Sequence, residues 1–98
     1  MNQQISEIKK EYQGIQSQLN AAGAVSDSRK MAELGKRQAE LAEIMGIIAD
    51  FEKIEKNMQE NAEIINTEED PELKQMAIDE NIKLSEKKKK LEKNLERC

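Results

Sequence analysis

The residues that most often carry out chemistry in proteins are scarce in this sequence. It contains no histidine, and its one cysteine, Cys98, is the last residue. Without histidine, the chain offers neither the commonest general base nor a nucleophilic triad of the Ser-His-Asp or Cys-His kind. One cysteine without histidine also excludes an ordinary zinc site, and none of the four glycines belongs to a phosphate-binding loop. We therefore expect no enzyme, no cofactor and no small-molecule substrate.

Carboxylates are plentiful, but their pattern favours helix surface over acid–base catalysis. Glu7 and Glu11 stand one helical turn apart among lysines, and Glu92 and Glu96 repeat this arrangement near the other end of the chain. The acidic group at residues 68–72 could attract a cation, but it lacks the spacing of a calcium-binding loop. A capped turn explains this group better than a metal site.

Concentrated positive charge occurs only in the lysine run at residues 87–90. Four consecutive residues point in different directions around a helix, so they do not form one binding stripe. Two interpretations are open. The run is solvated and pairs with acidic residues of the central segment such as Asp50 or Glu52, which we favour, or it contacts RNA phosphate.

Two isoleucines, Ile78 and Ile82, stand one turn apart and off the main apolar stripe of their segment. They either pack under loose neighbours or form an exposed docking patch. Together with the lysine run they define the candidate contact surface: Ile78, Ile82, Lys87, Lys88, Lys89 and Lys90.

The elements that would position these side chains are three segments with apolar residues at helical spacing. The broadest stripe lies between residues 28 and 65, where two rows with a spacing of seven share one side of a helix. A face this wide contacts two helices at once, whereas the stripes of residues 3–21 and 71–97 are narrower. The last stripe is expected to begin at Leu73 and to include Ala77 and Cys98. The expected core consists of Leu34, Leu41, Ile44, Met45, Ile48, Phe51, Met58, Leu84, Leu91 and Leu95.

The segments between these stripes predict two tight turns. Gly23 suits a helix end, and Ser26, Asp27 or Ser28 suits the next helix start. Asp70 is a good N-cap, and Pro71 fits the first position of a helix. Because short connections imply antiparallel neighbours, we expect an all-α fold of helices at about 3–21, 28–65 and 71–97, with the long central helix flanked by two shorter ones.

Composition agrees with long amphipathic helices. The 98 residues make at most one domain, and apolar and charged residues each account for 37% of them. The net charge of −4 argues mildly against a general nucleic-acid binder. No signal peptide and no apolar run of membrane-spanning length is present, so we expect a cytoplasmic chain with no membrane partner.

Three stretches, placed on these helices, are similar to one protein family. They are Lys30-Met31-Ala32-Glu33-Leu34 leading into residues 36–45, the aromatic Phe51, and Asp70-Pro71-Glu72 followed by Met76-Ala77 and Glu80. They resemble the amino-terminal helical domain of bacterial class I peptide chain release factors, and look closest to release factor one. The likeness covers essentially all 98 residues. Met31 and Gly35 depart from it, because the family commonly has an aromatic residue and a better helix former there.

The resemblance implies a role without catalysis. Factors of this kind read stop codons through a tripeptide motif and a recognition loop, and trigger peptidyl-tRNA hydrolysis through a Gly-Gly-Gln loop. None of these elements lies in this sequence, so no residue here inherits their roles. The resemblance implies a fragment of a longer factor, with the large-subunit stalk base of the ribosome and the release-factor GTPase as partners.

Two other classes of protein fit parts of the pattern. The amino-terminal arm of a seryl-tRNA synthetase has a similar length and helical content and binds tRNA. A free-standing coiled-coil adaptor or chaperone fits the composition, but does not account for the Asp70-Pro71-Glu72 turn. Self-association of the isolated chain is also open, through Ile78, Ile82 or a Cys98 bridge.

Overall fold

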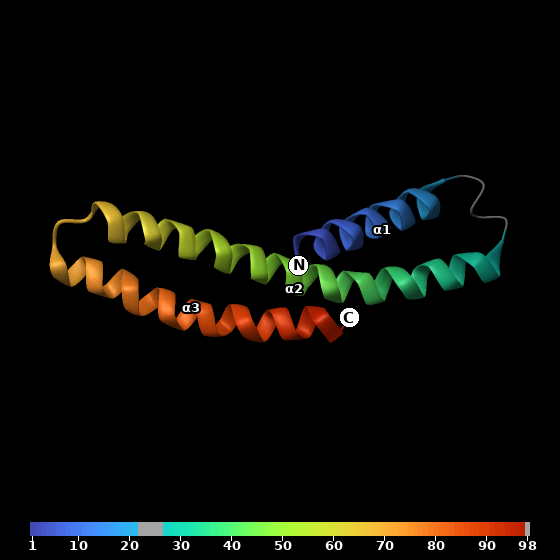
Figure 1. The fold of residues 1–98 in the computed structure, drawn as a ribbon. Coiled ribbons are helices and arrows are strands. Elements are labelled where there is room, and N and C mark those ends of the chain that lie inside the picture. The colour runs from blue at the N-terminus through green and yellow to red at the C-terminus, as the bar shows by residue number, and fades with distance from the viewer. Residues whose placement is uncertain (22–26, 98) are drawn as a thin grey trace. The chain divides into compact units, whose positions relative to one another are not determined.

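The computed structural model describes residues 1–21 and 27–97, which form three helices in antiparallel succession (Figure 1). They are α1 (Asn2–Asn20), α2 (Ser28–Thr67) and α3 (Pro71–Arg97). No strand occurs within the described ranges. The predicted all-α fold with a long central helix is confirmed, and α2 ends two residues beyond the expected Ile65. The expectations for Gly23, Ser26 and Cys98 lie outside the described residues.

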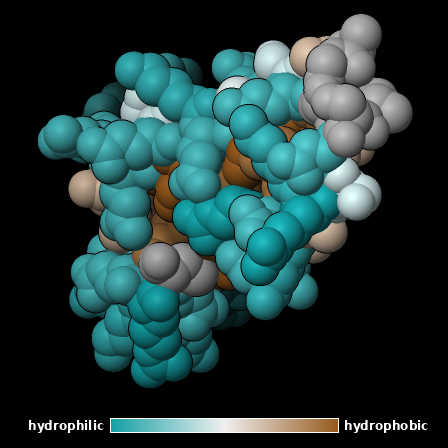
Figure 2. All heavy atoms as spheres, turned by 90° about the vertical axis from the view of Figure 1, so that its right-hand side faces the viewer, coloured by the Kyte–Doolittle hydropathy of each residue, from teal (hydrophilic) through white to brown (hydrophobic). Residues whose placement is uncertain are grey.

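The chain divides into two compact units, Met1–Gly46 and Ile47–Cys98, and α2 belongs to both. In the first unit α1 packs on the first part of α2, and in the second unit α3 packs on the remainder of α2 (Figure 1). The central helix therefore contacts both flanking helices, as the width of its apolar stripe predicted. Hydrophilic side chains cover most of the face shown in Figure 2, with apolar surface visible between them.

In the first unit, the stripe of α1 places Ile5 and Ile15 in the buried interior, where Leu41 of α2 is fully buried. One ion pair joins the two helices at their surface. The Arg37 guanidinium donates hydrogen bonds of 2.7 and 3.0 Å to the two carboxylate oxygens of Glu11, and a third of 3.2 Å to Glu40. This bidentate geometry is the strongest form of an Arg–carboxylate contact.

The start of α2 is capped by a side chain from the predicted set. Asp27 Oδ1 accepts a hydrogen bond of 3.1 Å from the backbone N–H of Lys30. This bond satisfies one of the backbone donors that a helix start leaves without an intrahelical partner.

The turn between α2 and α3 is built by local side-chain chemistry. Asp70 Oδ1 accepts a hydrogen bond of 2.9 Å from the N–H of Glu72, and Pro71 is the first residue of α3. Glu68 Oε1 accepts a hydrogen bond of 3.1 Å from the N–H of Asp70. The predicted cap and proline position are confirmed.

In the second unit, the apolar part of the interior consists of Ile48, Phe51, Ala77, Leu84 and Leu95, all of them buried. Five members of the expected core are partly exposed. They are Leu34, Ile44 and Met45 in the first unit, and Met58 and Leu91 in the second. Leu73, which the spacing assigned to the buried stripe of α3, is 47% exposed. That assignment is wrong: Leu73 lies in the first turn of α3, next to the connection, where the neighbouring Ile64 of α2 is also exposed.

Candidate functional site

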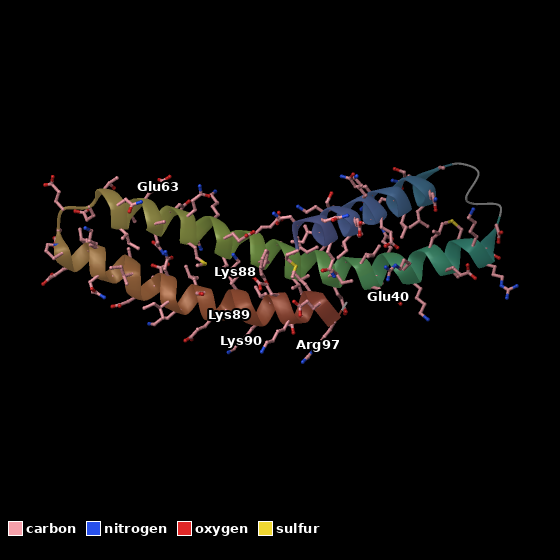
Figure 3. The ribbon with its side chains drawn as sticks, viewed as in Figure 1. Glu40, Glu63, Lys88, Lys89, Lys90 and Arg97 are labelled. Atoms are coloured by element: carbon pink, nitrogen blue, oxygen red, sulfur yellow. The ribbon has the colours of Figure 1, made fainter. Side chains whose placement is uncertain are left out.

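Lys88 of the lysine run faces α2 (Figure 3). Its Nζ lies 3.5 Å from Glu55 Oε2 and 5.6 Å from the centroid of the buried Phe51 ring. An ammonium group at this distance from an aromatic face is attracted by the electrons of the ring. The favoured interpretation, pairing with acidic residues of the central helix, holds for Lys88, although its partner is Glu55 and not one of the two carboxylates named from the sequence. The Lys88 ammonium group is therefore engaged by side chains of α2.

Lys87 and Lys90 line a shallow hollow of about 420 Å³ between α2 and α3. Lys53 and Asp50 of α2 line it as well, so three ammonium groups and one carboxylate surround the opening. The apolar part of the lining consists of Ile54, Leu84 and Leu91. We call this feature the basic hollow. It is suited to a negatively charged partner.

Lys89 lines a separate hollow of about 440 Å³, together with Ile78 and Ile82. Ile82 is 57% exposed and Ile78 is partly buried, so the pair divides between the two interpretations offered for it. The structure thus brings Ile78, Ile82 and Lys89 together and leaves Lys87 and Lys90 on the basic hollow. The prediction that the run does not form one stripe is confirmed.

Charge is distributed unevenly along the hairpin of α2 and α3. Residues 60–80 carry eight carboxylates and one lysine, a net charge of −7. Residues 81–97 carry seven basic and three acidic side chains, a net charge of +4. The end of the hairpin that contains the turn is therefore acidic, and the opposite end is basic. The acidic end is suited to a basic partner, and the basic end is suited to an acidic one.

Apolar side chains that the sequence analysis did not predict to be on the surface gather at the acidic end. Ile64, Leu73 and Met76 are exposed and line a hollow of about 270 Å³. Glu68 and Glu80 line the same hollow. We call it the acidic hollow. The helical spacing of Leu73, Met76 and Glu80 is a signal that could have grouped them, but it could not have shown that the group faces solvent.

Among the described residues, shifts in pKa occur at the ion pair of the first unit, between Glu11 and Arg37. The hydrogen bonds from Arg37 hold the pKa of Glu11 below its usual value. The same bonds, with one to Glu40, raise the pKa of the Arg37 guanidinium. Both side chains are exposed. The pair serves the packing of α1 on α2.

The described residues offer neither a cluster of metal ligands nor a membrane-spanning helix. In residues 1–21 and 27–97, no group of three or more His, Cys, Asp or Glu side chains is placed to hold a metal ion. The carboxylates at the turn accept backbone hydrogen bonds instead, as a capped turn requires. No helix in the described part of the chain combines the length and the apolar character needed to cross a membrane.

Comparison with known proteins gives consistent matches across the chain. The family model of the PCRF domain matches residues 8–98. Peptide chain release factor 1 of Chloroherpeton thalassium is 34% identical over 97% of this chain and 26% of its own length. Peptide chain release factor 1 of Thermus thermophilus is 30% identical over 99% of this chain and 27% of its own length. The same factor of Helicobacter pylori is 33% identical over 89% of this chain and 24% of its own length.

These matches cover only part of each relative. This chain spans about a quarter of the length of the curated proteins that it matches. No solved structure matches it.

Proposed function

Because the chain belongs to the PCRF domain family, we propose that it is the helical domain of a translation termination factor, and that it acts by binding the ribosome. The observation that carries the proposal is the extent of the family match, which includes all of α2 and α3 and most of α1. Relatives named peptide chain release factor 1 align with nearly the whole chain, which supports the same role.

In this proposal the chain contributes binding and no chemistry. A factor of this kind promotes hydrolysis of peptidyl-tRNA after it recognises a stop codon, and its Gly-Gly-Gln loop is absent from these 98 residues. We also propose that the 98 residues act as one helical domain of a longer cytoplasmic factor, since α2 belongs to both units.

The partners we propose are the large-subunit stalk base of the ribosome and the release-factor GTPase. Of the candidate contact residues, Lys87 and Lys90 suit the ribosome best, because both line the basic hollow with Lys53. Three ammonium groups around one opening would neutralise phosphates and release their counterions. Lys88 is the least suited of the four lysines, because Glu55 and Phe51 already engage its ammonium group.

The test is co-sedimentation of the purified chain with bacterial large ribosomal subunits at low salt. We expect the chain to be retained, and we expect Lys87→Glu with Lys90→Glu to weaken retention about tenfold or more, because two attractive charges become repulsive. A matched pair of reversals in the first unit, Lys10→Glu with Lys36→Glu, should leave retention within about twofold.

Two results would contradict the proposal. Failure of the unaltered chain to sediment with large subunits would remove the ribosomal role. Selective binding of serine tRNA, with no retention on large subunits, would favour the alternative of a synthetase arm. Equal losses in both pairs of reversals would retain the ribosome as partner but remove the basic hollow from the contact.

A further inference from the structure

Exposed apolar surface is concentrated at the acidic hollow. Five large apolar side chains in the described ranges are strongly exposed, and three of them, Ile64, Leu73 and Met76, line this one feature. Met76 is 66% exposed, the highest value among the five. Scattered exposed apolar residues need no explanation, but a cluster around a depression is typical of an interaction site.

The size of the hollow limits what can enter it. Its volume of about 270 Å³ lies below the roughly 300–1,000 Å³ of pockets that enclose whole small molecules. It is open to solvent and lined from both helices, by Ile64 of α2 and by Leu73 and Met76 of α3. A space of this kind is suited to one or two aliphatic side chains of a partner. The unbranched and flexible side chain of Met76 can adapt to their shape.

The charge around the hollow limits the class of partner. Glu68 and Glu80 line it, and the surrounding residues 60–80 have a net charge of −7. This potential repels nucleic acid and attracts basic groups. A partner that satisfies both the apolar lining and the acidic surroundings needs large apolar side chains with Lys or Arg close to them. An amphipathic helix presents these two features at a spacing of three and four residues.

We propose that the acidic hollow, formed by Ile64, Leu73, Met76, Glu68 and Glu80 at the turn between α2 and α3, binds a basic amphipathic helix of a partner protein. An apolar side chain of the partner enters between Leu73 and Met76, and its flanking ammonium or guanidinium groups pair with Glu68 and Glu80. This site is separate from the basic hollow proposed to contact the ribosome, and its lining residues belong to no other proposal.

The probe for this test is a fluorescein-labelled synthetic peptide of about four helical turns, with leucines on one face and lysine, arginine and alanine elsewhere. Its control peptide has the same composition, with the leucines distributed around the helix. Fluorescence anisotropy measures the binding of each peptide to the 98-residue chain. We expect the amphipathic peptide to bind at least about tenfold more tightly than the control, because only its leucines can enter the hollow together.

Variants of the chain identify where the peptide binds. Leu73→Ser with Met76→Ser should weaken binding of the amphipathic peptide about tenfold. Both side chains are exposed, so the fold should be retained, and circular dichroism checks this. Ile82→Ser is the matched control, because Ile82 is an equally exposed apolar residue of α3 that lines the other hollow. It should leave the affinity unchanged.

A second pair of variants tests the charge. Glu80→Gln should weaken binding about two- to threefold at low salt and have no effect at high salt, since exposed charges are screened. Glu86→Gln removes a carboxylate of α3 that lines the hollow of Ile82, and it should have no effect at either salt concentration.

Three outcomes would overturn the proposal. Equal affinity for the two peptides would mean that charge alone attracts them. Binding of a single-stranded RNA that Leu73→Ser with Met76→Ser abolishes would assign the hollow to nucleic acid. A dimer of the chain that the same variant dissociates would assign the hollow to a second copy. Retention of the chain by ribosomal subunits is tested with other variants, Lys87→Glu with Lys90→Glu, so the failure of one proposal can be distinguished from the failure of the other.

Discussion

The side-chain amide of Asn61 on α2 donates a hydrogen bond of 3.0 Å to the side-chain carbonyl of Asn81 on α3. Asn81 in turn donates a hydrogen bond of 3.2 Å to the backbone carbonyl of Met58. Asn61 is only 8% exposed and is the one buried polar side chain in the described ranges. A polar pair between two amphipathic helices fixes their register, because a shift of either helix would leave both amides without a partner.

The first prediction concerns this pair. Asn61→Ala should lower the free energy of unfolding by about 1–3 kcal/mol, because it leaves the carbonyl oxygen of Asn81 without its donor. Asn61→Leu combined with Asn81→Leu should recover most of the loss, since two apolar groups of similar size need no partner. Urea denaturation of the single and double variants measures both effects. A double variant that is no more stable than Asn61→Ala would contradict this explanation.

The second prediction concerns glycines within helices. Apart from its chain neighbours and the backbone of its own helix, a Cβ added at Gly14, Gly35 or Gly46 would meet no atom within 4 Å, so each position is open to alanine. Gly→Ala at each should raise the free energy of unfolding by about 0.5–1 kcal/mol, because alanine has less backbone freedom to lose on folding. Thermal denaturation followed by circular dichroism measures the gain.

The control for the two substitutions in α2, at Gly35 and Gly46, is the reverse change at an exposed site on the same helix. Ala42→Gly should lower the stability of α2 by a similar amount. A loss of stability on Gly35→Ala or Gly46→Ala would indicate that the backbone is approached closely there in solution.

The third prediction compares the same substitution at a buried and an exposed leucine. Leu41 is fully buried and Leu73 is 47% exposed. Leu41→Ala should lower the free energy of unfolding by about 2–5 kcal/mol, because it removes buried methyl groups and leaves a cavity. Leu73→Ala should lower it by less than about 1 kcal/mol. Equal losses in the two variants, measured by urea denaturation, would contradict the burial that distinguishes them.

Leu73 also shows where sequence reasoning reached its limit. Local chemistry was readable: Asp70 and Pro71 specify a helix start through their own side chains, and the structure places them there. Helical periodicity was readable as well, and it predicted the wide face of α2. Periodicity cannot show how far the buried interior extends toward the turn, so it assigned Leu73 to the interior although Leu73 and the neighbouring Ile64 of α2 are both exposed there.

The candidate sites were less predictable than the fold for a related reason. Each hollow is lined from two helices, so its membership depends on which side chains become neighbours across the hairpin. The pairing of Lys88 with Glu55 and the grouping of Ile64 with Met76 both join residues of α2 to residues of α3. A single sequence shows the pattern on each helix, but not which side chains of two helices become neighbours. The burial of Asn61 was missed because asparagine side chains are mostly exposed in folded proteins.

The fourth prediction concerns the pH dependence of the Glu11–Arg37 pair. Arg37 holds the pKa of Glu11 in the folded state below its ordinary value of 4.5. A carboxyl group with a lowered pKa binds fewer protons in the folded state than in the unfolded state, so the pair stabilises the fold above pH 4.5. This stabilisation is lost as the pH falls from 4.5 through the lowered pKa. The guanidinium stays charged throughout, because even its ordinary pKa lies far above this pH range.

The measurement is the midpoint of thermal unfolding of the unaltered chain and of Glu11→Gln between pH 7 and pH 2. We expect the unaltered chain to melt at the higher temperature at pH 7, and the difference to shrink below pH 4.5 and vanish at the lowest pH. Added salt should reduce the difference, because both side chains are exposed. Glu7→Gln is the matched control, and it should not show a difference that disappears in this pH range. A gap between the unaltered chain and Glu11→Gln that persists at the lowest pH would mean that Glu11 contributes through its packing and not through its charge.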